Sequence, residues 1–171
     1  MKKLFLLSIL FIFLLSGCDI YNLNYFTLPD DAEFLALVQE LDTPQKICDY
    51  MSDNFTYKLH TFYALDPYIL WQNKEGDCND FATFGIFIAD YHNYETYLIK
   101  VFNETSLRHY IAVYKEYDYY SITDNQYYFL GFNNFKEIVN FDSEYMIPNR
   151  KWSKYIVYDY DMDIFETVYN N

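Results

Sequence analysis

Residues 74–84 read KEGDCNDFATF, and they decide how the chain is interpreted because they place one cysteine, Cys78, between a Gly-Asp pair and an apolar run. From Asp77 onward apolar residues return at helical spacing, which predicts a buried helix through about Tyr91. Cys78 would then lie at the helix N-terminus, where the positive end of the helix dipole favours a thiolate. The alternative is that Cys78 is simply a small buried side chain, so a nucleophile needs a partner elsewhere in the chain.

Two features beside Cys78 suit a thiol that attacks a carbonyl group. Gly76 is expected to let the backbone turn tightly and to leave room for a substrate chain. The backbone N–H groups of the first helical turn could stabilise the oxyanion that forms at the attacked carbonyl.

The start of the chain resembles a bacterial lipoprotein signal. Lys2 and Lys3 precede an apolar run from Leu4 to Leu15, and residues 15–18 read LSGC. The run is shorter than the ~20 residues that cross a bilayer as a helix, and it fits the apolar part of a secretory signal peptide. An uncleaved anchor and a plain signal peptide are the alternatives.

This leader predicts the organisation and the location of the protein. We expect a lipoprotein signal peptide at 1–17, a lipidated Cys18 with a short tether at 18–28, and one domain at 29–171. The acyl chains would hold the domain to a membrane of a bacterial cell envelope, facing the periplasm or the exterior. We expect a monomer.

Composition excludes some partners. The formal net charge is −13, and loss of the leader would remove two lysines and no acids. Such a chain does not suit nucleic acid, whose phosphates call for a basic surface. The 21 tyrosines and 16 phenylalanines could form a glycan-binding platform, but they are also what an AT-rich genome produces.

The remaining pattern predicts an α+β domain in which helices precede an antiparallel meander sheet. Apolar spacing predicts helices at 29–41 and 42–55 and a short helix or turn at 66–73. After the cysteine helix the period changes to two. The predicted strands are 95–103, 108–117, 119–125 and 151–161, with a brief helix at 133–141.

Two residues on neighbouring predicted strands could complete a site around Cys78. His109 shares a strand face with Ile111 and Val113, which we expect to be directed toward the cysteine helix. A hairpin at 117–119 would bring the start of that strand next to Asp124 at the end of the following one. Asp124 could then hold the imidazole in the orientation that a general base needs.

At this point the chain resembles the transglutaminase-like cysteine proteins, and most of all the bacterial transglutaminase-like cysteine proteinases. The segments that carry the resemblance are WQNKEGDCNDFA at 71–82, RHYIAV at 108–113 and ITDN at 122–125. The resemblance covers about residues 68–126 and implies a papain/transglutaminase-like core. It also implies that Cys78 is the nucleophile, His109 the general base and then acid, and Asp124 the orienting acid.

Weaker candidates come from the same resemblance. Related cysteine enzymes often carry an oxyanion-stabilising side chain in the region of Trp71 and Gln72, although packing and solvent exposure explain these two residues equally well. Some relatives bind calcium through acids that flank the cysteine, which here are Asp77 and Asp80. Asn79 stands where a glutamate is common, and the lost charge weakens a site for a hard cation. We expect no cofactor.

The leading functional hypothesis is a membrane-anchored thiol enzyme that hydrolyses an amide bond in a protein or peptide of the cell envelope, with transfer to an amine as the variant reaction. One alternative is a non-catalytic surface lipoprotein that binds peptide or glycan in the same groove. Another is a structural envelope protein with a disulfide between Cys48 and Cys78, which an exported compartment permits. Cys48 lies beside Ile47 and Met51 in a helical pattern and is interpreted as a core residue.

Overall fold

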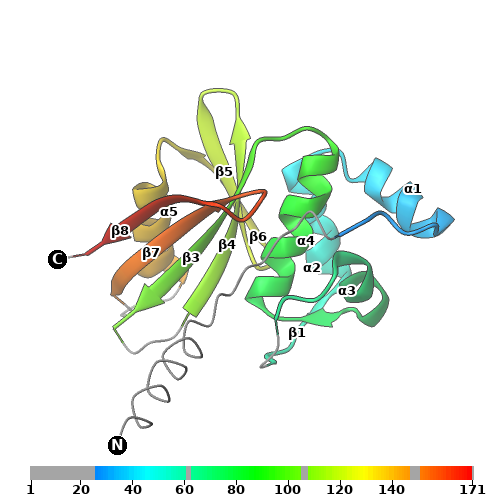
Figure 1. Ribbon diagram of the computed structural model, residues 1–171, viewed down its shortest axis with the longest axis horizontal. Helices are drawn as coiled ribbons and strands as arrows, with labels where there is room; N and C mark the ends of the chain where they lie inside the picture. Colours follow the sequence, from blue (N-terminus) through cyan, green and yellow to red (C-terminus); the bar gives the residue numbers. More distant parts are fainter. Residues whose placement is uncertain (1–25, 61–62, 105–107, 147–150, 171) are drawn as a thin grey trace, which may run out of the picture.

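The computed structural model describes residues 26–60, 63–104, 108–146 and 151–170, which combine helices with an antiparallel sheet (Figure 1). The predicted α+β class, with the cysteine helix packed on a meander sheet, is confirmed. The leader at 1–17, Cys18 and the tether up to residue 25 lie outside the described residues. Within the described ranges, no helix combines the length and apolar character that crossing a membrane requires.

The four helices that the structure describes before the large sheet each begin at a side chain that accepts hydrogen bonds from the first helical turn, where backbone N–H groups otherwise lack partners. These caps are Asp31, Thr43, Asp66 and Asp77. The helices are α1 (Ala32–Glu40), α2 (Pro44–Asn54), α3 (Pro67–Asn73) and α4 (Cys78–Tyr91). Figure 1 shows α4 between the sheet and helices α1 and α3, whereas α2 also contacts β5 and β6.

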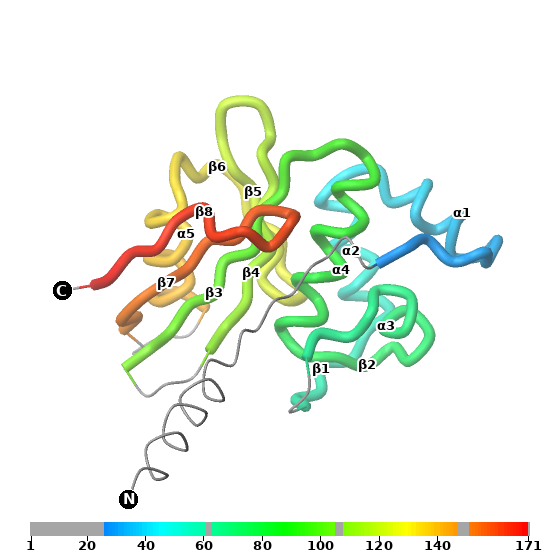
Figure 2. Tube along the Cα trace, viewed as in Figure 1, coloured from blue at the N-terminus to red at the C-terminus, as the bar shows by residue number. Residues whose placement is uncertain are grey.

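Six strands form the large sheet in the order β6-β5-β4-β3-β7-β8, and all neighbouring pairs are antiparallel. The chain runs through β3 to β6 as a meander and then returns so that β7 pairs with the free side of β3 (Figure 2). The strands are β3 (Thr96–Asn103), β4 (Arg108–Glu116), β5 (Tyr119–Asp124), β6 (Tyr127–Phe132), β7 (Trp152–Asp159) and β8 (Ile164–Tyr169). Between β6 and β7 lie α5 (Phe135–Phe141) and the π-helix η2 (Asp142–Met146).

A second, very small sheet lies directly before the cysteine helix. It consists of β1 (Thr56–Tyr57) and β2 (Glu75–Gly76), which run parallel. Because β2 ends two residues before α4 begins, this pairing brings Tyr57 to the start of that helix.

The large sheet carries a hydrophobic core on each face. On one face, Ala112 and Tyr114 of β4 pack with α4. On the other face, Ile111 and Val113 pack with α5. The prediction that Ile111 and Val113 are directed toward the cysteine helix is therefore wrong. Alternation shows which residues of a strand share a face, but it does not show which helix covers that face.

Gly85 allows α4 to lie close to the sheet. A Cβ atom at this position would collide with the hydroxyl of Tyr114 and would lie 3.3 Å from Oγ1 of Thr123. These two hydroxyls are buried and hydrogen-bonded to each other at 2.7 Å. Gly85 thus sets the distance between α4 and the strands β4 and β5. This distance also fixes the position of Cys78 relative to the sheet.

Candidate active site

Cys78 is the first residue of α4, and a capping box holds it there. The carboxylate of Asp77 accepts a hydrogen bond from the N–H of Asn79 at 3.0 Å. In return, Oδ2 of Asp80 accepts one from the N–H of Asp77 at 2.6 Å. The residue that carries the thiol is 8% exposed, so the thiol lies at a rigid and largely dry helix start.

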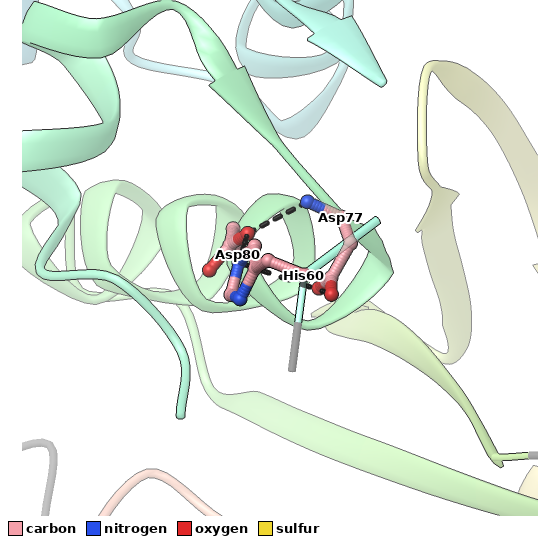
Figure 3. Close-up of side chains that lie close together, drawn as sticks. All are labelled: His60, Asp77 and Asp80. Carbon is pink, nitrogen blue, oxygen red and sulfur yellow. Dashed lines mark hydrogen bonds and ion pairs between the residues drawn. The ribbon is translucent and has the colours of Figure 1, made fainter. Parts of the chain in front are cut away.

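His60 contacts the same helix start from the segment before α3 (Figure 3). Its Nε2 atom lies 2.6 Å from Oδ2 of Asp80 and 3.8 Å from Oδ2 of Asp77. The other oxygen of Asp80, Oδ1, accepts a hydrogen bond from the N–H of Leu65 at 2.7 Å. The fully buried Asp80 therefore ties the segment before α3 to the cysteine helix.

Gly76 is required for packing around this cluster. A Cβ atom at Gly76 would lie 2.7 Å from Oδ2 of Asp80 and 2.7 Å from Cδ1 of Leu70. The expectation that Gly76 leaves room for a substrate chain is wrong, because the carboxylate of Asp80 fills that space.

His109 and Asp124 extend from neighbouring strands and are hydrogen-bonded. The pairing of Ala112 with Thr123 makes His109 and Asp124 diagonal neighbours on one face of β4 and β5. Nε2 of His109 lies 2.7 Å from Oδ1 of Asp124, and Asp124 is 1% exposed. The hairpin turn between these strands contains Tyr117 in the left-handed backbone region.

Burial and three neighbouring groups act on the protonation of His109. Burial is the largest influence and lowers its pKa. The hydrogen bond to Asp124, the thiol of Cys78 and the charge of Asp142 act in the opposite direction. Together they outweigh burial, so the pKa of His109 lies well above its ordinary value. An imidazolium between a carboxylate and a thiol is the partner that stabilises a thiolate.

Cys78 and His109 line one cavity of about 350 Å³, within the size range of ligand pockets. Val101 and Trp152 form an apolar part of its wall. Asn125, Ser143 and Arg108 add polar groups, so the cavity can contact both the side chains and the backbone of a peptide.

Tyr57 is a member of this site that the sequence did not single out. It lines the same cavity as Cys78, and its hydroxyl is close enough for Cys78 to affect the pKa of the phenol. Partial burial, followed by the charges of Cys78 and Asp77, raises the pKa of Tyr57 to about 12, so the phenol remains a hydrogen-bond donor at neutral pH. Nothing in the sequence separates it from the other tyrosines, because its place depends on the pairing of β1 with β2.

Asp142 is the second such residue. It begins η2 and is 3% exposed, and its Oδ1 atom lies 3.7 Å from Nε2 of His109. Burial raises the pKa of Asp142 to about 7, with His109 lowering it and Asp124 raising it. No motif marks Asp142, since it simply follows the apolar pattern of α5.

The structure does not bring Trp71 and Gln72 to the cavity. The Trp71 ring stacks on Tyr68 with centroids 5.6 Å apart and also contacts Phe34. Gln72 is exposed on α3. Neither residue lines the cavity that contains Cys78.

Cys48 and Cys78 are both free cysteines in the structure. Cys48 is buried on α2, in the core position that its helical pattern predicts. Burial, with smaller effects from Asp49 and Asp124, raises the pKa of Cys48 to about 12, which makes it a poor nucleophile.

The residues around Asp77 and Asp80 do not fit a calcium ion as they are arranged. Calcium takes six to eight oxygen ligands. Both oxygens of Asp80 already accept hydrogen bonds, and Oδ1 of Asp77 accepts one from Asn79. A nitrogen atom of His60 lies between the two carboxylates, where a cation would have to bind.

Comparison with known proteins concerns the fold alone. No protein-family model and no curated protein matches the sequence. Among solved structures, the EGTA-treated form of LapG from Legionella pneumophila is similar, with 14% identity over 70% of this chain and 68% of that chain and a TM-score of 0.48. The calcium-bound form of LapG covers 70% of both chains at 14% identity, with a TM-score of 0.44. A candidate cysteine protease of Cytophaga hutchinsonii has 12% identity over 85% of this chain and 61% of that chain, with a TM-score of 0.43.

Proposed function

We propose that this protein is a thiol enzyme that hydrolyses an amide bond, with Cys78 as nucleophile, His109 as general base and acid, and Asp124 as the orienting acid. The observation that carries the proposal is that Cys78 from α4 meets the hydrogen-bonded pair of His109 and Asp124 at one cavity. A thiol next to an oriented imidazole is the arrangement that nucleophilic catalysis requires. The resemblance to transglutaminase-like cysteine proteins implies the same three roles.

In the first step, the sulfur of Cys78 attacks the carbonyl carbon of the amide. Because Asp124 holds Nε2 of His109, Nδ1 is the ring nitrogen that exchanges a proton with the reactants. This nitrogen gives its proton to the departing amine as the C–N bond breaks, and a thioester on Cys78 remains.

In the second step, water attacks the thioester carbonyl while the neutral His109 accepts a proton from the water. The C–S bond breaks, a carboxylic acid is released and the thiolate–imidazolium pair is restored. An amine in place of water would give a new amide instead of the acid. Hydrolysis is the proposed outcome because water is abundant at a surface cavity.

The oxyanion of each tetrahedral intermediate needs hydrogen-bond donors. The proposed donors are the backbone N–H of Cys78 and the hydroxyl of Tyr57. Tyr57 and Cys78 line the same cavity, so the carbonyl oxygen of a substrate would enter between these two donors. The N–H at the first position of a helix has no partner within the helix, which leaves it available for this role.

The proposed substrate is a protein or peptide of a bacterial cell envelope, and the proposed anchor is lipid on Cys18, with the enzyme facing the periplasm or the exterior as a monomer. The LSGC segment supports the location. The charge of −13 gives no reason to propose a nucleic-acid partner.

Calcium is not part of the proposed mechanism. LapG has a calcium-bound form. In this chain, calcium at Asp77 and Asp80 would require His60 to release Asp80, because its nitrogen lies 2.6 Å from that carboxylate. We propose that His60 holds the helix start in the active protein.

The proposal is tested in cells that express the protein, its Cys78→Ala and His109→Ala variants, and Cys48→Ala as a matched control. New protein N-termini and deamidated side chains in the envelope fraction are measured by mass spectrometry. The products should be present with the wild type and Cys48→Ala and absent with the other two variants. Identical products with wild type and Cys78→Ala would overturn the proposal and favour a non-catalytic binding lipoprotein.

A further inference from the structure

We propose that Asp142 is a positioning residue of this site, which shares one proton with Asp124 and thereby holds Asp124 in place as the acceptor for His109. The positioning role of Asp142 in catalysis rests on the proposed function. The shared proton does not, because it would be present whether or not the protein is an enzyme.

The position of Asp142 supports this role. It enters from η2, whereas His109 and Asp124 come from β4 and β5. Ligand-type atoms of all three side chains lie within 4.8 Å of one another. Both carboxyl groups belong to residues that are at most 3% exposed, so bulk water screens their interaction little.

The hydrogen bonding of the two carboxyl groups is incomplete without a proton. Oδ2 of Asp124 and Oδ1 of Asp142 are both buried and have no hydrogen-bond partner in the described structure. Two carboxyl groups with oxygen atoms within 4.8 Å of each other repel when both are ionised, so the second one loses its proton less easily. Burial makes the second negative charge more costly still. One proton shared between the groups removes a buried charge and gives both oxygens a partner.

The charges that face Asp142 agree with a neutral carboxyl group. His109 and Arg108 face the cavity from β4, Asp124 faces Asp142 from β5, and Cys78 lies beyond His109 on α4. The imidazolium of His109 is already balanced by Asp124 at 2.7 Å. The pKa of Asp142, raised to about 7 chiefly by burial, indicates that it keeps its proton under mildly acidic to neutral conditions.

The variants Asp142→Asn and Asp142→Leu both remove the titratable carboxyl group, but only Asp142→Asn keeps a hydrogen-bond donor at this position. The amide of asparagine can donate a hydrogen bond to Asp124 at every pH, whereas leucine fills the space without a donor. Glu144→Gln is the matched control, since it removes an exposed acid from the same η2 segment. All buffers contain EDTA, so that no cation replaces the proton.

The first readout is the urea midpoint of wild type and Asp142→Asn between pH 4 and 8. A carboxyl group whose folded pKa is raised stabilises the fold fully below its unfolded pKa, and this stabilisation is lost as pH rises through the folded value. The urea midpoint of Asp142→Asn minus that of the wild type should therefore increase from about pH 4 to about pH 7. Above about pH 7 this difference should be constant. A difference that is flat across this range, as expected for Glu144→Gln, would overturn the shared proton.

The second readout is the rate at which iodoacetamide alkylates Cys78 at pH 6. Asp142→Asn should stay within about threefold of the wild type, and Asp142→Leu should be slower by roughly tenfold or more, because Asp124 then lacks a partner and no longer fixes His109. Equal rates for all three proteins would overturn the positioning role. If Cys78 of the wild type reacts no faster than Cys48, the thiol-enzyme proposal fails instead, while the urea readout still reports on the proton.

Discussion

His109 and Asp124 are hydrogen-bonded at 2.7 Å although 15 positions separate them in the chain. A single hairpin places them as diagonal neighbours, and Asp124 is almost completely buried beneath the imidazole. A buried carboxylate in this position fixes one ring nitrogen and leaves the other available for the thiol. This relationship separates Cys78 from an ordinary buried cysteine such as Cys48.

Asp124→Ala should lower the rate of Cys78 alkylation at pH 7 by roughly 10²-fold, the lower end of what the loss of acid–base assistance costs. Without the carboxylate, the imidazole loses both its orientation and the charge that favours its protonated form. Asp118→Ala is the control, since Asp118 is exposed in the turn of the same hairpin. Equal rates in the two variants would show that Asp124 does not act on the thiol.

Tyr57→Phe should reduce kcat for a p-nitrophenyl ester by roughly 10- to 10²-fold with little change in KM, because the hydroxyl is needed only when the oxyanion forms. The ring contact of Tyr57 with Phe81 remains in the variant, so the fold is preserved. Tyr127→Phe on the exposed edge strand β6 serves as control. An unchanged kcat in Tyr57→Phe would remove this residue from the mechanism.

The thermal midpoint should be the same in excess EGTA and in millimolar calcium chloride, because a ligand raises the midpoint only when it binds the folded state. His60 occupies the position between the two carboxylates that calcium would need. A rise of several degrees in calcium would contradict this prediction and show that the folded protein binds the ion.

Gly85→Ala should destabilise the fold by ~1–3 kcal/mol through overpacking against Tyr114. Alanine in a helix interior is favoured over glycine by ~1 kcal/mol, so the collision outweighs the gain in helix propensity. Adding Tyr114→Phe removes the colliding hydroxyl, and the cost of Gly85→Ala measured in that background should fall clearly. If the losses in free energy of unfolding of Gly85→Ala and Tyr114→Phe, measured in urea, simply add in the double variant, the position of the helix does not depend on this contact.

The order of helices and central strands could be predicted from sequence because their apolar residues recur at helical or strand spacing. The predicted strand at 95–103 is observed at Thr96–Asn103, and the predicted strand at 119–125 at Tyr119–Asp124. The sequence pattern does not predict the edge strands β6 and β8. All of their residues are exposed or only partly buried, so the two strands lack a clear apolar alternation.

The residues Cys78, His109 and Asp124 could be selected from sequence because local patterns place each of them at the end of an element. Tyr57 and Asp142 could not, since each reaches the site through contacts between segments that are distant in the chain. Alternation likewise does not reveal that α5, and not α4, covers Ile111 and Val113. The local pattern thus identifies the reacting groups, and tertiary packing supplies the groups that assist them.

The central claim is that the environment of Cys78 activates its thiol, and the most direct test is the alkylation rate of each cysteine in the native protein at pH 7. Peptide mapping by mass spectrometry after iodoacetamide treatment measures Cys78 and Cys48 in the same sample, and His109→Ala provides the comparison. Cys78 should react much faster than Cys48 in the wild type and lose most of that advantage in His109→Ala. Equally slow labelling of both cysteines in the folded wild type would contradict the account.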